Sequence, residues 1–167
     1  MKKDDRFYLL KRVVLKVPQN YTHQNQLGRF QQYRKKFCYW NTGITDINFA
    51  RVSQKLIPGK TYIVEFYGIK TRVPDNECLE FLKSQNAILT GAQGITLFWE
   101  LQKREFPLSK YTVSLDEKDA LWKDKTDQIS KAAGIARSPG DRWGLQVFFS
   151  GYKLQKGSCL LCFKADS

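Results

Sequence analysis

The amino-acid sequence predicts one α+β domain over residues 1–167, with about five or six strands in a mainly antiparallel sheet and about three helices packed on it. Apolar residues make up 42% of the chain and charged residues 26%, both close to the averages of globular domains. Segments with strand and helix periodicity do not alternate regularly, which favours an antiparallel or mixed sheet over a doubly wound parallel one. No internal repeat or linker divides the chain.

Hydrophobic periodicity predicts two strands and one helix in the first part of the chain. Apolar residues alternate with Arg12 and Lys16 in the first strand, and Pro18 ends it. Leu27, Phe30 and Phe37 recur at helical spacing. The elements predicted here are a strand at 7–17, a loop at 19–26, a helix at 24–38, a turn at 41–43 and a strand at 61–69, whereas residues 44–57 fit neither period.

Hydrophobic periodicity predicts further helices and strands in the second part of the chain, where one segment is weakly patterned. Asp75 is expected to cap the first of these helices, and Asp116 the last. Residues 123–142 are mostly polar and predict no element until a turn at 138–141. The elements predicted here are helices at 75–84, 92–104 and 116–122 and strands at 110–115, 143–149 and 159–163, the last two strands forming an antiparallel pair.

The charge of the chain is strongly positive and unevenly placed. Lys and Arg number 28 and Asp and Glu 16, for a formal net charge of +12. Counted by segment, the net charge is +9 over residues 1–58, −1 over 59–128 and +4 over 129–167. If the first and last segments meet in the fold, they form a positive face that attracts nucleic acid, anionic lipid or an acidic protein. Solubility alone is the other explanation of this charge.

Basic and aromatic residues alternate most densely between residues 29 and 40. Basic groups neutralise phosphates, and exposed aromatic rings stack on unpaired bases. An ordinary amphipathic helix with a basic outer face would show the same pattern. The residues predicted to bind nucleic acid or a partner, with the polar side of the first strand extending the patch, are Lys11, Arg12, Lys16, Arg29, Tyr33, Arg34, Lys35, Lys36, Tyr39 and Trp40.

The sequence gives little support for a catalytic or metal site. Cys159 and Cys162 have the spacing of a thiol pair, but in a strand residues three apart point to opposite faces. His23 is the only histidine and lies in a polar segment, so we expect a solvated ring rather than a general base. Gly91 and Gly94 form a helix-entry turn without a complete phosphate-loop motif. We expect no catalytic residue, no metal and no cofactor.

These observations predict a small non-enzymatic binding protein in the cytoplasm. No apolar run is long enough to span a membrane, no secretion signal is visible, and four cysteines are too few for a disulfide scaffold. The predicted partner is nucleic acid, bound by the basic N-terminal face. The alternative is a protein–protein interaction module, an inhibitor or accessory subunit, that binds an acidic or apolar partner surface.

Overall fold

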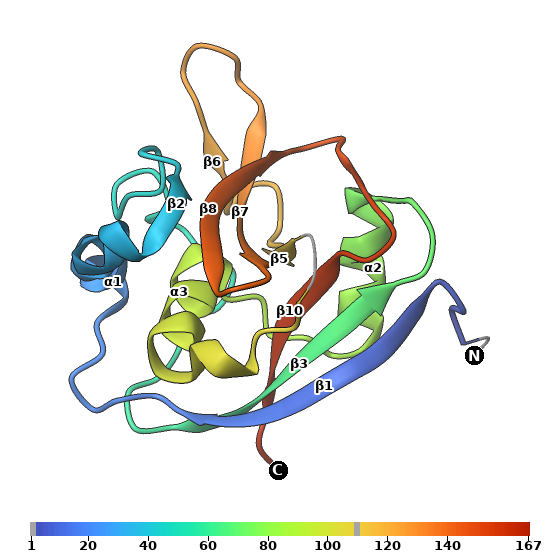
Figure 1. Cartoon of the computed structure of the whole chain (residues 1–167), viewed down its shortest axis with the longest axis horizontal. Helices are drawn as coiled ribbons and strands as arrows, with labels where there is room; N and C mark the ends of the chain where they lie inside the picture. The colour runs from blue at the N-terminus through green and yellow to red at the C-terminus, as the bar shows by residue number, and fades with distance from the viewer. Residues whose placement is uncertain (1–2, 109–110) are drawn as a thin grey trace.

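The fold is a large mixed sheet with helices on both of its faces (Figure 1). The computed structural model describes residues 3–108 and 111–167. The strands are β1 Phe7–Lys16, β2 Phe37–Trp40, β3 Thr61–Ile69, β4 Val73–Pro74, β5 Thr112–Ser114, β6 Trp122–Lys123, β7 Ser130–Ser138, β8 Arg142–Phe149, β9 Lys153–Leu154 and β10 Cys159–Ala165. The helices are α1 Gln26–Phe30, α2 Asp75–Ser84 and α3 Gly91–Gln102, with 3-10 segments η1 His23–Asn25, η2 Gln31–Lys36 and η3 Lys103–Glu105.

Over the described residues the main sheet has eight strands, in the order β1-β3-β10-β5-β7-β8-β2, with β6 paired to β7 beside this path. The pairs β10–β5 and β2–β8 are parallel, and the other pairs are antiparallel. Strands β4 and β9 form a separate two-stranded sheet. β1 and β2 therefore lie at opposite edges of the main sheet.

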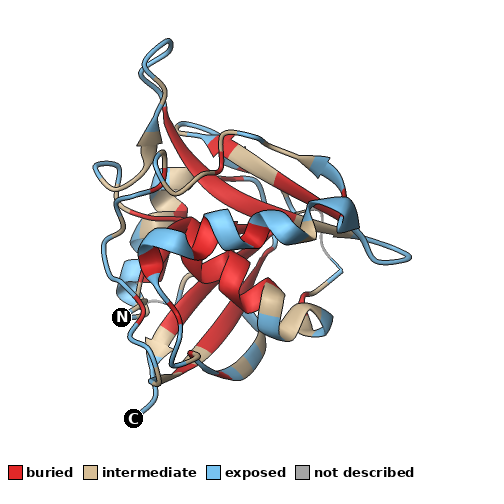
Figure 2. Ribbon diagram, turned by 90° about the vertical axis from the view of Figure 1, so that its left-hand side faces the viewer, coloured by how far each residue is buried: buried red, intermediate tan, exposed pale blue. Residues whose placement is uncertain are grey.

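Apolar side chains on both faces of the central strands build two core clusters. Leu161 and Phe163 of β10 belong to the cluster that contains α3, whereas Leu160 and Cys162 belong to the cluster that contains α2. Figure 2 shows buried residues along the strands that cross the middle of the molecule and exposed residues on the outer loops. Burial on both faces explains why the first five residues of β10 are all apolar in sequence.

The α+β class is confirmed, but the sheet is larger and more mixed than predicted. The predicted pairing of 143–149 with 159–163 is wrong. Strand β8 pairs with β7 through a tight hairpin in which Gly140 and Asp141 adopt positive φ, as short hairpin loops require. Strand β10 instead lies between β3 and β5, where its apolar residues are covered on both faces.

Strand β7 is the main element that the sequence prediction missed. It lies within segment 123–142, whose weak pattern predicted no element before the turn. Its Ala and Gly residues are small because neighbouring groups come close: a Cβ on Gly134 would lie 2.9 Å from the Thr112 carbonyl oxygen and 2.4 Å from the Phe148 ring. Periodicity is weak where small residues fill both faces of a strand.

Two predicted helices also differ from the structure. The helix predicted at 24–38 is broken into η1, α1 and η2, and its last two residues begin strand β2, which pairs with β8. The short helix predicted at 116–122 is absent; Asp116 is buried and accepts hydrogen bonds from the backbone of Ser53 and Glu117. Pro74, rather than Asp75, occupies the N-cap of α2. Lys110, the first residue of the predicted strand 110–115, lies outside the described residues.

Candidate functional site

Segment 26–36 is anchored by hydrogen bonds at its start and by aromatic packing beneath it. The Asp46 carboxylate accepts hydrogen bonds from the backbone amides of Leu27 and Gly28, at 2.9 and 2.7 Å. Phe30 is buried and lies 5.4 Å from Trp99 of α3, ring centroid to ring centroid. Apolar residues of this segment thus face the core, and its polar residues face solvent.

Packing leaves only one of the predicted binding aromatics strongly exposed. Trp40 is stacked on Phe30, with ring centroids 5.5 Å apart. Tyr33 packs edge-on against Trp99 at 5.2 Å and donates a hydrogen bond to Glu100 Oε1 at 3.0 Å. Burial and this hydrogen bond raise the pKa of Tyr33. Tyr39, in contrast, is 53% exposed.

Four cations at the start of β2 and β8 are exposed and form no ion pair within the described residues. Three are consecutive, Arg34, Lys35 and Lys36 at the end of η2. The fourth, Arg142, begins β8. Because β2 and β8 are parallel and Phe37 pairs with Trp143, Lys36 and Arg142 lie at the same end of adjacent strands. We call Arg34, Lys35, Lys36, Tyr39 and Arg142 the β2 basic surface.

Arg29 does not belong to this unpaired group. Its guanidinium contacts both carboxylate oxygens of Glu100, at 2.9 and 3.0 Å. Glu100 thereby joins α3 to the side chains of Arg29 and Tyr33 in segment 26–36. Arg29 therefore stabilises the position of the segment rather than offering a free charge.

The predicted residues of β1 lie apart from the β2 basic surface, at the other edge of the sheet. Consecutive residues of a strand point to opposite faces, and Lys11 and Arg12 have different partners. Lys11 forms an ion pair with Glu105 of η3 at 2.5 Å. Arg12 contacts Glu65 of β3. Lys16 is exposed opposite Thr61 and has no ion pair in the described part of the chain.

Glu65 is the centre of a polar cluster that joins three strands. Its side chain is only 1% exposed. Arg12 of β1 donates to Oε1 from Nε at 2.9 Å and from Nη2 at 2.6 Å. Lys164 of β10 lies 2.7 Å from Oε2, and the Tyr67 hydroxyl donates a short hydrogen bond to the same oxygen. One buried carboxylate is thus compensated by two cations and a phenol.

The charge states of this cluster follow from burial and hydrogen bonding. Burial raises the pKa of Glu65, but the hydrogen bonds from Lys164, Tyr67 and Arg12 outweigh it, so the pKa of Glu65 lies below its usual value. Burial and the bond to Glu65 raise the pKa of Tyr67. Burial also raises the pKa of Cys162, which pairs with Glu65 across β10 and β3, to about 12. At neutral pH the carboxyl is ionised, and the phenol and thiol are neutral.

The sequence prediction did not single out this cluster. A glutamate inside an otherwise apolar central strand was the signal, since a buried charge requires partners. Its partners Arg12 and Lys164 are distant in sequence, so spacing alone could not show the cluster.

His23 is buried, contrary to the prediction of a solvated ring. Its side chain is 6% exposed, and Nε2 lies 3.2 Å from the carbonyl oxygen of Ala50. Burial lowers the pKa of His23, and the contact with Ala50 only partly offsets this. Cys159 and Cys162 both lie in β10, so the strand predicted at 159–163 is confirmed.

Comparison with models of protein families, with curated proteins and with solved structures gives no significant match. Within residues 3–108 and 111–167, no group of three or more His, Cys, Asp and Glu side chains is arranged to hold a metal ion. None of the helices described is both long and apolar enough to cross a lipid bilayer.

Proposed function

We propose that the protein is a non-enzymatic nucleic-acid-binding protein that uses the β2 basic surface. The observation that carries this proposal is the group of four exposed, unpaired cations among the described residues, at the start of β8 and of β2, the strand that carries the exposed Tyr39. Cations without carboxylate partners are available to neutralise phosphates and release counterions. Tyr39 adds one ring on which an unpaired base can stack.

The pairing of β2 with β8 supports the proposal because it joins the two basic segments of the chain. Strand β2 belongs to segment 1–58, with net charge +9, and β8 to segment 129–167, with net charge +4. The fields of both segments add where Lys36 and Arg142 are adjacent. A cytoplasmic location, where thiols stay reduced, is part of this proposal.

The test is binding of fluorescent single- and double-stranded oligonucleotides across a salt series. We expect binding at low salt that weakens steeply toward physiological salt, because phosphate contacts release counterions. The triple variant Arg34→Glu, Lys35→Glu, Lys36→Glu should weaken binding by about tenfold or more and flatten the salt dependence.

A matched control separates this surface from net charge. Lys118, Lys123 and Lys125 are exposed, form no ion pair in the described structure and lie around β6. Reversing these three charges changes the net charge equally but should leave most of the binding intact. Equal losses in both triple variants, or no binding at low salt, would overturn the proposal.

An acidic protein surface is the second candidate partner. One observation favours it: only Tyr39 among the predicted aromatics is strongly exposed, so recognition relies on charge, which acidic proteins also supply. Trp99 and Trp143 are buried in the core and are not available as interface anchors. Binding to polyglutamate but not to an unrelated oligonucleotide would favour this candidate.

A further inference from the structure

A pocket of about 630 Å³ lies beside the Glu65 cluster, at the opposite edge of the main sheet from the β2 basic surface. Its apolar wall includes Phe7 and Leu9 of β1 and Phe81 of α2. Leu9 is 46% exposed although it pairs with Tyr67 in the sheet, so an apolar side chain here remains uncovered. The volume is within the range of sites for small organic ligands.

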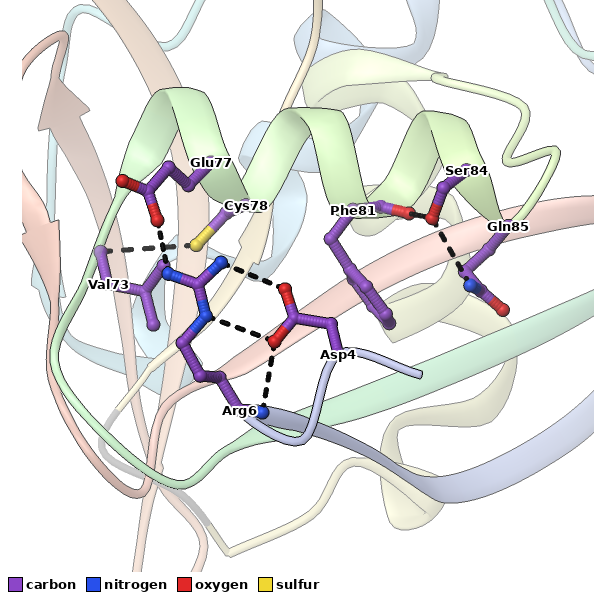
Figure 3. A network of polar contacts seen from close by, with 8 residues as sticks. All are labelled: Asp4, Arg6, Val73, Glu77, Cys78, Phe81, Ser84 and Gln85. Atoms are coloured by element: carbon purple, nitrogen blue, oxygen red, sulfur yellow. Dashed lines mark hydrogen bonds and ion pairs between the residues drawn. The ribbon is translucent and has the colours of Figure 1, made fainter. Parts of the chain in front are cut away.

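Polar contacts hold the wall of this pocket in place. Arg6 donates to Asp4 from Nη2 at 2.8 Å and also contacts Glu77 of α2. Figure 3 shows Arg6 between these two carboxylates, with the Phe81 ring pointing from α2 toward the sheet near Asp4. Phe7 is stacked on Phe81 with ring centroids 4.0 Å apart. The segment before β1 is thus fixed against α2.

The other end of the pocket is lined by Arg12 and Lys164. An arginine has five N–H groups and a lysine three. Arg12 uses Nε and Nη2 on Glu65 Oε1, and Lys164 contacts Glu65 Oε2 and the Tyr67 hydroxyl. Both cations therefore keep N–H groups that donate no hydrogen bond to another described residue.

The charge at this end is positive, because two cations surround one carboxylate. Glu65 also fixes the two cations beside each other, since each is bonded to a different oxygen of its carboxylate. Asp4, on the rim, is already engaged by Arg6. Preorganised donors at one end of a pocket and an apolar wall at the other match an organic anion.

We propose that this pocket binds a small organic anion, a carboxylate or phosphate monoester with an apolar body. The anionic group contacts Arg12 and Lys164, and the body lies on Leu9 and Phe81. This site does not depend on the nucleic-acid-binding function proposed above, and the two are tested with different variants.

The experiment is a calorimetric titration of the full chain, first with phenyl phosphate and then, separately, with phenylacetate. We expect saturable binding of at least one of the two probes. Inorganic phosphate and benzyl alcohol should each bind at least about tenfold more weakly, because each lacks one half of the recognised structure. Arg12→Gln should lower the affinity for the probe by about tenfold or more, because a charge-assisted contact is lost.

Lys16→Gln is the matched control, since it removes the same charge from the same strand outside the pocket lining. It should leave probe binding unchanged, as should the triple variant of residues 34–36. Lys164→Met removes the second cation of the pocket and should also weaken binding of the probe. Failure of both probes to bind, or equal binding by Arg12→Gln and Lys16→Gln, would overturn the inference whatever the oligonucleotide result.

Discussion

At the scale of single residues, the contacts of each cation decide its role. Arg29 and Arg12 look alike in sequence to Arg34, yet they contact Glu100 and Glu65 respectively. These carboxylates come from other elements of the fold. Charge counting therefore predicts that the chain is basic, but the fold decides which charges stay free for a ligand.

His23 provides a residue-scale prediction because it is the chain's only histidine. Its pKa in the folded state lies below the ordinary histidine value of about 6.5, so the unfolded chain takes up the proton first. As pH falls below about 6.5 and toward the folded pKa, stability should decrease. Urea unfolding at a series of pH values between about 7 and 5 measures this effect.

The variant His23→Gln replaces the imidazole with an amide, which can still donate to the Ala50 carbonyl oxygen but does not titrate. The difference in unfolding free energy between this variant and wild type should therefore depend on pH over the same window. The contributions of the other titrating groups to the unfolding free energy are the same in both proteins and cancel in this difference. A difference that stays constant from pH 7 to 5 would show that the folded state does not disfavour the charged ring.

At the scale of elements, strand β7 depends on the small size of its residues. Gly134→Ala should lower the free energy of unfolding by about 1–3 kcal/mol, because the new Cβ meets the backbone of Thr112 and the ring of Phe148. Gly144→Ala in neighbouring β8 is the control. There the nearest atom is the flexible Gln146 amide at 3.3 Å, and the expected loss is below about 1 kcal/mol. Denaturant unfolding of both variants measures the contrast, and equal losses would contradict it.

Elements with strong periodicity could be predicted from the sequence, and elements defined by tertiary contacts could not. Residues 61–69 and 75–84 match β3 and α2 because their patterns reflect burial directly. Segment 24–38 has helical spacing, but pairing of β2 with β8 ends the helical turns at Lys36. Strand β7 carries a buried lysine, Lys131, whose charge is paired with Asp127 at 2.9 Å, so the segment looks exposed in sequence.

The candidate site was predictable only in part for the same reason. Exposed Arg34, Lys35 and Lys36 lie within the predicted patch. Arg142 joins them only through the parallel pairing of strands, which no local pattern specifies. The pocket beside Glu65 likewise requires β1, β3, β10 and α2 together.

At the scale of the whole molecule, β10 connects two halves of the sheet. It pairs with β3 on one side and with β5 on the other. A chain that ends at Ser158 should not fold cooperatively, because β1–β3 and β5–β7–β8–β2 would lose their shared neighbour. Far-ultraviolet circular dichroism and thermal unfolding measure this loss.

A chain that ends at Ala165 is the control, since it retains all of β10 and removes only two exposed residues. It should unfold like the full chain. If the chain that ends at Ser158 still shows a sharp unfolding transition, the two halves are stable separately and β10 is not required for folding.

The position of β10 also affects how the protein is made. This strand follows all the other strands in sequence, yet it fills the middle of the sheet. During translation, β3 and β5 must remain without their common neighbour until residues 159–165 have left the ribosome. The nascent chain therefore presents two unpaired, apolar inner edges, which are sites for aggregation or for binding by chaperones. The sheet is therefore expected to be completed only when β10 becomes available to pair with both β3 and β5.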